Sequence, residues 1–111
     1  PRLVGVGMAK QLLFTADVIN AAEALRIGLV NEVVNPEDLL ERVKEIAGRI
    51  CSKGKLAVRF AKVAANEGMQ TDIDRAMTIE ADLFGLCFST EDQKEGMAAF
   101  IEKRSPLFVG K

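Results

Sequence analysis

The stretch NPEDLLERVKEIAGRI, residues 35–50, decides how the rest of the sequence is interpreted. Asn35 is a favourable N-cap, Pro36 suits a first helical turn, and the two carboxylates that follow meet the positive end of the helix dipole. Leucine, valine and isoleucine then recur at three- and four-residue steps, the period of an amphipathic helix. The pattern predicts a helix that extends to about Ser52, and it places a boundary between residues 35 and 36.

Before that boundary the sequence predicts two helices and a strand. Residues 1–14 carry apolar side chains near one helical stripe. Asn20 is a second N-cap, for a short helix over residues 21–27. Gly28 follows at the position where a helix commonly ends in a left-handed residue. Residues 29–34 are rich in valine and leucine and form the one strong strand candidate. Because one strand cannot make a sheet, we expect the sequence to be the end of a longer α/β chain.

After the boundary the sequence predicts only helices. Residues 52–55 form a turn, and a helix follows from Leu56 to about Gly68. A long helix opens at Thr71, and a last one opens at residues 89–92 and is stopped by the Ser-Pro pair at 105–106. The expected fold class is therefore mainly α, with about six helices and one strand.

Composition excludes several classes of function. Fifteen basic residues balance 16 acidic ones, so the net charge of −1 predicts neither a nucleic-acid nor a membrane partner. No apolar run approaches the length of about 18 residues that a membrane span needs. The chain has no His, Trp or Tyr, which excludes Ser-His and Cys-His triads and histidine metal sites. Cys51 and Cys87 lack a CxxC partner and are expected to be free, buried thiols in a reducing cytoplasm, with a disulfide as the alternative.

Two stretches resemble one known family. Residues 13–34, LFTADVINAAEALRIGLVNEVV, and residues 89–104, STEDQKEGMAAFIEKR, are similar to two ordered motifs of the crotonase (enoyl-CoA hydratase/isomerase) family. The resemblance covers nearly the whole chain. Within the family the sequences of these two stretches are most similar to those of bacterial short-chain 3-hydroxybutyryl-CoA dehydratases.

The resemblance implies a fold and an activity. Residues 1–35 would end the crotonase ββα-spiral core, and residues 36–111 would form a C-terminal helical domain that covers the pocket and forms oligomers. The whole enzyme would interconvert a 2-enoyl-CoA such as crotonyl-CoA with its 3-hydroxyacyl-CoA, with no metal or other cofactor. The family's paired glutamates and its glycine-rich oxyanion turns lie upstream of the stretch that matches Pro1. We therefore assign no catalytic residue and expect the chain to be inert by itself.

The same resemblance implies three substrate-binding residues. Phe84 matches a residue of the acyl pocket, and Phe100 and Lys103 match the adenine and phosphate end of the CoA site. A core role for either phenylalanine, or a helix-dipole role for Lys103, is the alternative.

Several charged residues have simpler interpretations than catalysis. Glu80, Glu91 and Glu95 are expected to be solvated or ion-paired, although Glu80, between apolar neighbours, could be partly buried. Lys53 and Lys55 flank Gly54 but lack the glycine-rich lead of a phosphate loop, so a solvated turn is expected.

The expected partners are an acyl-CoA substrate and further copies of the chain. The resemblance implies a trimer or a dimer of trimers for the whole protein, and exposed apolar helix faces predict at least a dimer for the 111 residues. The expected location is cytoplasmic. Two alternatives remain open: an enoyl-CoA isomerase or other crotonase relative, and a non-catalytic, self-associating helical module.

Overall fold

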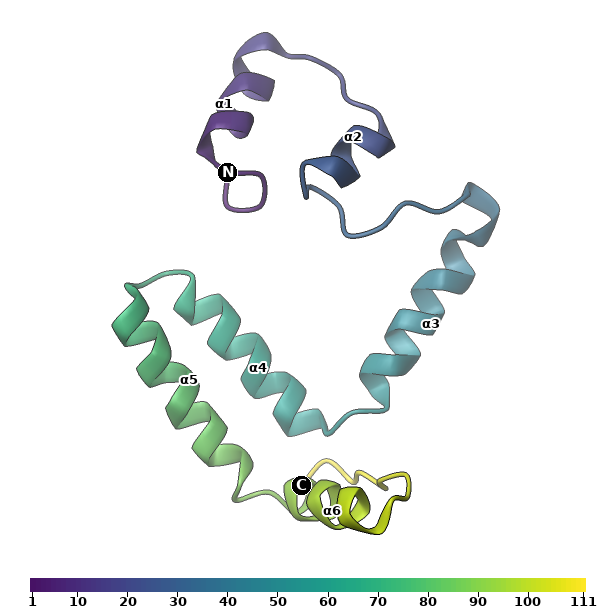
Figure 1. Cartoon of the computed structure of the whole chain (residues 1–111), viewed down its shortest axis with the longest axis vertical. Coiled ribbons are helices and arrows are strands. Elements are labelled where there is room, and N and C mark those ends of the chain that lie inside the picture. The colour runs from purple at the N-terminus through teal and green to yellow at the C-terminus, as the bar shows by residue number, and fades with distance from the viewer. The chain divides into compact units, whose positions relative to one another are not determined.

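Helices account for all the regular structure in the computed structural model, which describes residues 1–111 (Figure 1). Six α-helices and one short 3-10 helix follow in order: α1 (Val6–Thr15), α2 (Ala21–Arg26), η1 (Pro36–Asp38), α3 (Leu39–Cys51), α4 (Lys55–Gly68), α5 (Ile73–Cys87) and α6 (Glu91–Glu102). The predicted mainly-α character and the six helices are confirmed. The chain divides into two compact units, Pro1–Val43 and Lys44–Lys111.

The predicted strand over residues 29–34 is wrong. The backbone N–H groups of Leu29 and Val30 donate to the carbonyl oxygen of Ala24, at 2.9 and 3.3 Å, and so complete the C-terminal end of α2. Gly28 makes this reversal with a φ of 75°, the left-handed C-cap that the sequence predicts. The chain contains no β-strand with which residues 29–34 pair, so a valine-rich sequence alone does not produce a strand here.

The first helix begins later than predicted. Gly5 precedes α1 with a φ of 80°, outside the helical region, and residues 2–4 form a turn instead of a first helical turn. The cap of α2 is confirmed, because the Asn20 side chain accepts a hydrogen bond from the Glu23 N–H at 2.9 Å.

Asn35 does not cap with its side chain as predicted. Its amide nitrogen donates to the Asp38 carboxylate at 3.2 Å, and its carbonyl oxygen accepts from the Asp38 N–H at 3.0 Å. The turn that follows is the 3-10 helix η1, which leads directly into α3. Arg42 of α3 also bonds both carboxylate oxygens of Glu32, at 2.9 and 3.0 Å, which holds the irregular segment before Pro36 against the helix.

In the second unit α4 and α5 pack against each other as an antiparallel pair (Figure 1). They approach closely near the connection, where a methyl group on Gly68 would lie 3.4 Å from the Ala76 side chain. The N-cap of α5 is Asp72, which accepts from the Arg75 N–H at 3.0 Å, and not Thr71 as predicted.

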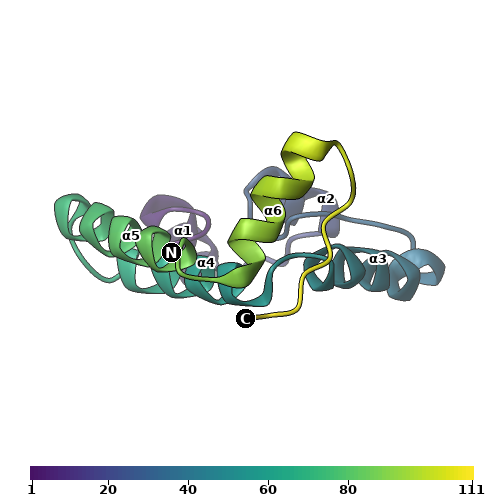
Figure 2. The same ribbon diagram turned by 90° about the horizontal axis from the view of Figure 1, so that it is seen from below.

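The last helix is followed by an extended C-terminal segment that returns beside it (Figure 2). The helix opens within residues 89–92 as predicted, and Thr90 is its N-cap, accepting from the Gln93 N–H at 3.1 Å. The helix ends at Lys103, which adopts a left-handed conformation, and therefore ends before Pro106. Hydrogen bonds from residues 107–111 to α6 hold the returning segment in place.

Very few side chains are buried. The buried hydrophobic residues are all alanines, Ala9, Ala24 and Ala99, while large apolar side chains on every helix are exposed. The stripe on α3 is an example, with Leu39, Leu40, Val43, Ile46 and Ile50 at least 40% exposed. No helix is long and apolar enough to cross a membrane. Each unit thus presents apolar surface that nothing in this chain covers.

Candidate functional site

An apolar groove of about 690 Å³ lies in the second unit between α4, α5 and the first turns of α6. Its wall is built mainly from alanine, phenylalanine and other apolar side chains, which leave room between the helices. The lining residues are Ala57, Phe60, Ala61, Ala64, Ala65, Ala76, Glu80, Leu83, Phe84, Cys87, Phe88, Gln93 and Met97. A groove of this size and character suits an apolar ligand or an apolar segment of protein.

Phe84 lies in this groove. Its ring packs edge-to-face on the Phe88 ring, with the centroids 5.2 Å apart and the planes at 71°. Phe84 is 64% exposed in this chain.

Phe100 and Lys103 lie at the other end of α6 and do not line the groove. Phe100 is 82% exposed in this chain. Lys103 is the exposed C-cap of the helix, and its backbone N–H donates to the carbonyl oxygen of Phe100 at 3.3 Å. The structure therefore brings the two residues expected at the CoA end together and separates them from Phe84.

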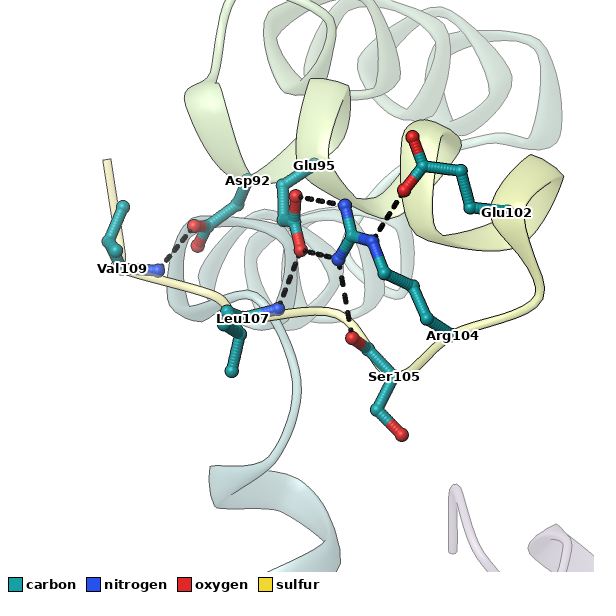
Figure 3. Close-up of polar contacts among 7 residues, drawn as sticks. All are labelled: Asp92, Glu95, Glu102, Arg104, Ser105, Leu107 and Val109. Atoms are coloured by element: carbon teal, nitrogen blue, oxygen red, sulfur yellow. Dashed lines mark hydrogen bonds and ion pairs between the residues drawn. The ribbon is translucent and has the colours of Figure 1, made fainter.

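Next to Lys103, Arg104 joins the end of α6 to its second turn (Figure 3). Its guanidinium bonds both oxygens of Glu95, at 2.5 and 2.9 Å, and its Nε donates to Glu102 at 2.6 Å. The Leu107 N–H donates to the same Glu95 carboxylate at 2.8 Å. Hydrogen bonds from Arg104 and Leu107 hold the pKa of Glu95 far below its ordinary range, at about 2. The expectation that Glu95 is ion-paired is confirmed.

Asp92 is an acidic residue that sequence reasoning did not single out. It is 5% exposed, and its carboxylate accepts from the N–H groups of Val109 and Gly110, at 2.7 and 2.9 Å. Gly54, at the start of α4, packs against it, and a methyl group there would lie 3.5 Å from the carboxylate. A first-turn aspartate is ordinarily explained by the helix dipole, so the sequence carries no signal of these distant partners.

Other predicted features have plain outcomes. Glu80 is exposed, so the idea that it is partly buried is wrong, and Glu91 is exposed as expected. Both cysteines are free, which excludes the disulfide, but Cys51 is exposed instead of buried and Cys87 is half-buried in the groove wall. No group of acidic or cysteine side chains could hold a metal ion.

Comparison with known proteins identifies the family of this chain. The model of the family described as enoyl-CoA hydratase/isomerase matches residues 1–111, so the chain belongs to that family. It is 77% identical to the crotonyl-CoA hydratase of Syntrophomonas wolfei over 111 residues, which are 100% of this chain and 43% of that protein. It is 62% identical to the short-chain-enoyl-CoA hydratase of Clostridium acetobutylicum over 103 residues, 93% of this chain and 40% of that protein.

The helical arrangement also matches a solved structure. The crystal structure of enoyl-CoA hydratase from Bacillus anthracis superposes with a TM-score of 0.96 at 43% identity, over 100% of this chain and 43% of that one. The chain thus spans about two fifths of the length of these relatives.

Proposed function

We propose that the protein to which these residues belong is a short-chain enoyl-CoA hydratase of the crotonyl-CoA type. It would add water reversibly to a 2-enoyl-CoA to give the 3-hydroxyacyl-CoA, with no metal or redox cofactor. The observation that carries the proposal is the 77% identity to a crotonyl-CoA hydratase over every residue of the chain. The test is the hydration of crotonyl-CoA by the complete protein, followed as loss of the enoyl-thioester absorbance. Absence of turnover on crotonyl-CoA would contradict the proposal.

We propose that this chain supplies binding surface and no catalytic group. Residues 1–35 would end the spiral core, and residues 36–111 would form the helical domain that covers the pocket. Phe84 would contact the acyl chain, which its place in an apolar groove supports. Phe100 and Lys103 would contact the adenine and phosphate end of CoA, which their exposure and their proximity support.

A charge reversal tests the proposed phosphate contact. Lys103→Glu in the complete protein should raise the KM for crotonyl-CoA by about tenfold or more, because a charge-assisted hydrogen bond to a phosphate becomes a repulsion. The kcat should change little, since Lys103 would lie far from the reacting bond. An unchanged KM would remove Lys103 from the CoA site.

Two other functions remain in view. The family description includes isomerases, and an enoyl-CoA isomerase would shift a double bond without consuming water, which the products of the same assay distinguish. The exposed apolar helix faces favour association with further copies, as in a trimer or a dimer of trimers, and are compatible with a non-catalytic helical module.

The two unpaired cysteines support the expected cytoplasmic location.

A further inference from the structure

Lys103 has a backbone conformation that lysine seldom adopts. Its φ of 54° and ψ of 39° are left-handed, and Ala16 is the one other non-glycine residue of the chain with positive φ. The Cβ atom makes this conformation unfavourable, so neighbouring contacts must maintain it. Two such contacts are backbone bonds at the end of α6: the Lys103 N–H donates to the carbonyl oxygen of Phe100 at 3.3 Å, and the Arg104 N–H donates to that of Ala99 at 3.0 Å.

A second set of contacts around this turn involves the Glu95 side chain (Figure 3). Arg104, the residue after Lys103, places Nη1 and Nη2 at 2.5 and 2.9 Å from the two oxygens of Glu95. The Leu107 N–H, on the far side of the turn, lies 2.8 Å from the same carboxylate. Glu95 therefore holds the chain both immediately after Lys103 and four residues after it. Its side chain is 25% exposed, so the pair is partly shielded from water.

We propose that Glu95 is a positioning residue for the CoA site: through Arg104 and Leu107 it maintains the left-handed turn that presents the Lys103 ammonium to the terminal phosphate of a CoA thioester. The inference rests on the proposed function, because it takes Lys103 as a CoA contact. Glu95 itself makes no contact with the ligand. A carboxylate near a phosphate would repel it, but the Arg104 fork occupies both oxygens of Glu95.

Glu102 provides a matched comparison on the same helix. It also bonds Arg104, with 2.6 Å between its oxygen and Nε, but it is 58% exposed. No hydrogen bond joins it to the backbone beyond Arg104, so it does not hold the far side of the turn. Glu95→Gln and Glu102→Gln each remove one negative charge. Only Glu95→Gln should free Lys103 from its left-handed conformation.

The experiment compares two substrates in the complete protein. Crotonyl-CoA carries the terminal phosphate, while crotonyl-pantetheine lacks the whole nucleotide. For crotonyl-CoA we expect Lys103→Met to raise KM about tenfold and Glu95→Gln about fivefold, with kcat within about twofold of the parent value. Glu102→Gln should leave KM within about twofold. None of these variants should change kcat/KM for crotonyl-pantetheine.

Two features of the experiment distinguish positioning of Lys103 by Glu95 from an electrostatic effect or a loss of structure. Removing a negative charge near a phosphate would by itself strengthen binding, so a rise in KM for Glu95→Gln has the opposite sign to simple electrostatics. In the double variant Glu95→Gln/Lys103→Met the KM should equal that of Lys103→Met alone, because Glu95 acts only through Lys103. Additive effects, or equal losses on both substrates, would overturn the inference and leave Glu95 with a structural role only.

The failures are distinguishable. If Lys103→Met leaves the KM for crotonyl-CoA unchanged, the proposed CoA contact is wrong and the inference is wrong with it. If Lys103→Met raises KM and Glu95→Gln does not, only the inference is wrong. Should Glu95→Gln fail to fold, Arg104→Lys keeps the charge but cannot form the fork, and the same pattern is expected. The ¹³Cα and ¹³Cβ chemical shifts of Lys103 should differ between the parent protein and Arg104→Lys, because the backbone of Lys103 would no longer be left-handed. Unchanged chemical shifts would also overturn the inference.

Discussion

The N–H of Gly110 donates to both carboxylate oxygens of Asp92, at 3.1 and 2.9 Å, although the two residues are 18 positions apart. The Asp92 N–H returns a bond to the carbonyl oxygen of Lys111 at 3.1 Å. This reciprocal pairing is the reason that an extended segment with no regular structure runs beside α6.

Loss of the Asp92 carboxylate should therefore be costly. Asp92→Ala leaves the N–H groups of Val109 and Gly110 without their acceptor at a site that is 5% exposed. We expect the free energy of unfolding to fall by about 2 kcal/mol, measured by urea denaturation. Glu91→Ala is the control, because Glu91 is exposed and precedes Asp92 on the same helix. Equal effects of the two substitutions would contradict the role given to Asp92.

The Glu95–Arg104 pair predicts a specific dependence on pH. The pKa of Glu95 falls from an ordinary value of 4.5 to about 2 in the folded chain. A depressed carboxylate pKa contributes stability that is fully present above the unfolded pKa and is lost as the pH falls through the folded one. The unfolding free energies of the parent and of Glu95→Gln should therefore differ by a constant amount above about pH 5. The difference should shrink between pH 4.5 and 2, and a difference that stays constant down to pH 2 would show that the charge is irrelevant.

The caps of the last two helices give a third prediction. Thr90→Ala should lower the free energy of unfolding by about 1 kcal/mol, because the Thr90 hydroxyl accepts from the Gln93 N–H at 3.1 Å. Thr90→Ser should retain most of the stability. Thr71→Ala is the control, since Asp72 and not Thr71 caps α5. A loss for Thr71→Ala as large as that for Thr90→Ala would mean that the caps are assigned wrongly.

Local signals were sufficient to predict the helices. The N-cap at Asn20, a helix start within residues 89–92 and a left-handed Gly28 are all properties of a few neighbouring residues, and each is present in the structure. The wrong strand depends on an absent neighbour. Residues 29–34 have the composition of a strand, but a strand also needs a hydrogen-bonding partner, and the N–H groups at the start of this segment bond α2 instead.

The candidate site divides in the same way. Phe84, Phe100 and Lys103 were predicted from the resemblance to a family, and the structure adds their exposure and surroundings without testing the ligand. The bonds of Asp92 and Glu95 to the returning segment could not be predicted, because an acidic residue in the first two turns of a helix already has a local explanation. Only the path of residues 105–111 in three dimensions reveals the partners.

The burial pattern leads to the last prediction, which concerns association. No buried hydrophobic residue is larger than alanine, and the α3 stripe leaves Leu40, Val43 and Ile46 at 64%, 51% and 40% exposure. Apolar surface of this kind is removed from water when a second copy or another part of a protein covers it, at about 25 cal/mol per Å². We therefore expect the 111-residue chain, at high micromolar concentration, to sediment as a dimer or larger species instead of its 12.1 kDa monomer. Val43→Lys should shift the equilibrium toward monomer, whereas Lys44→Arg, which preserves a neighbouring exposed charge, should not. Sedimentation equilibrium that fits a 12.1 kDa species alone would rule out self-association.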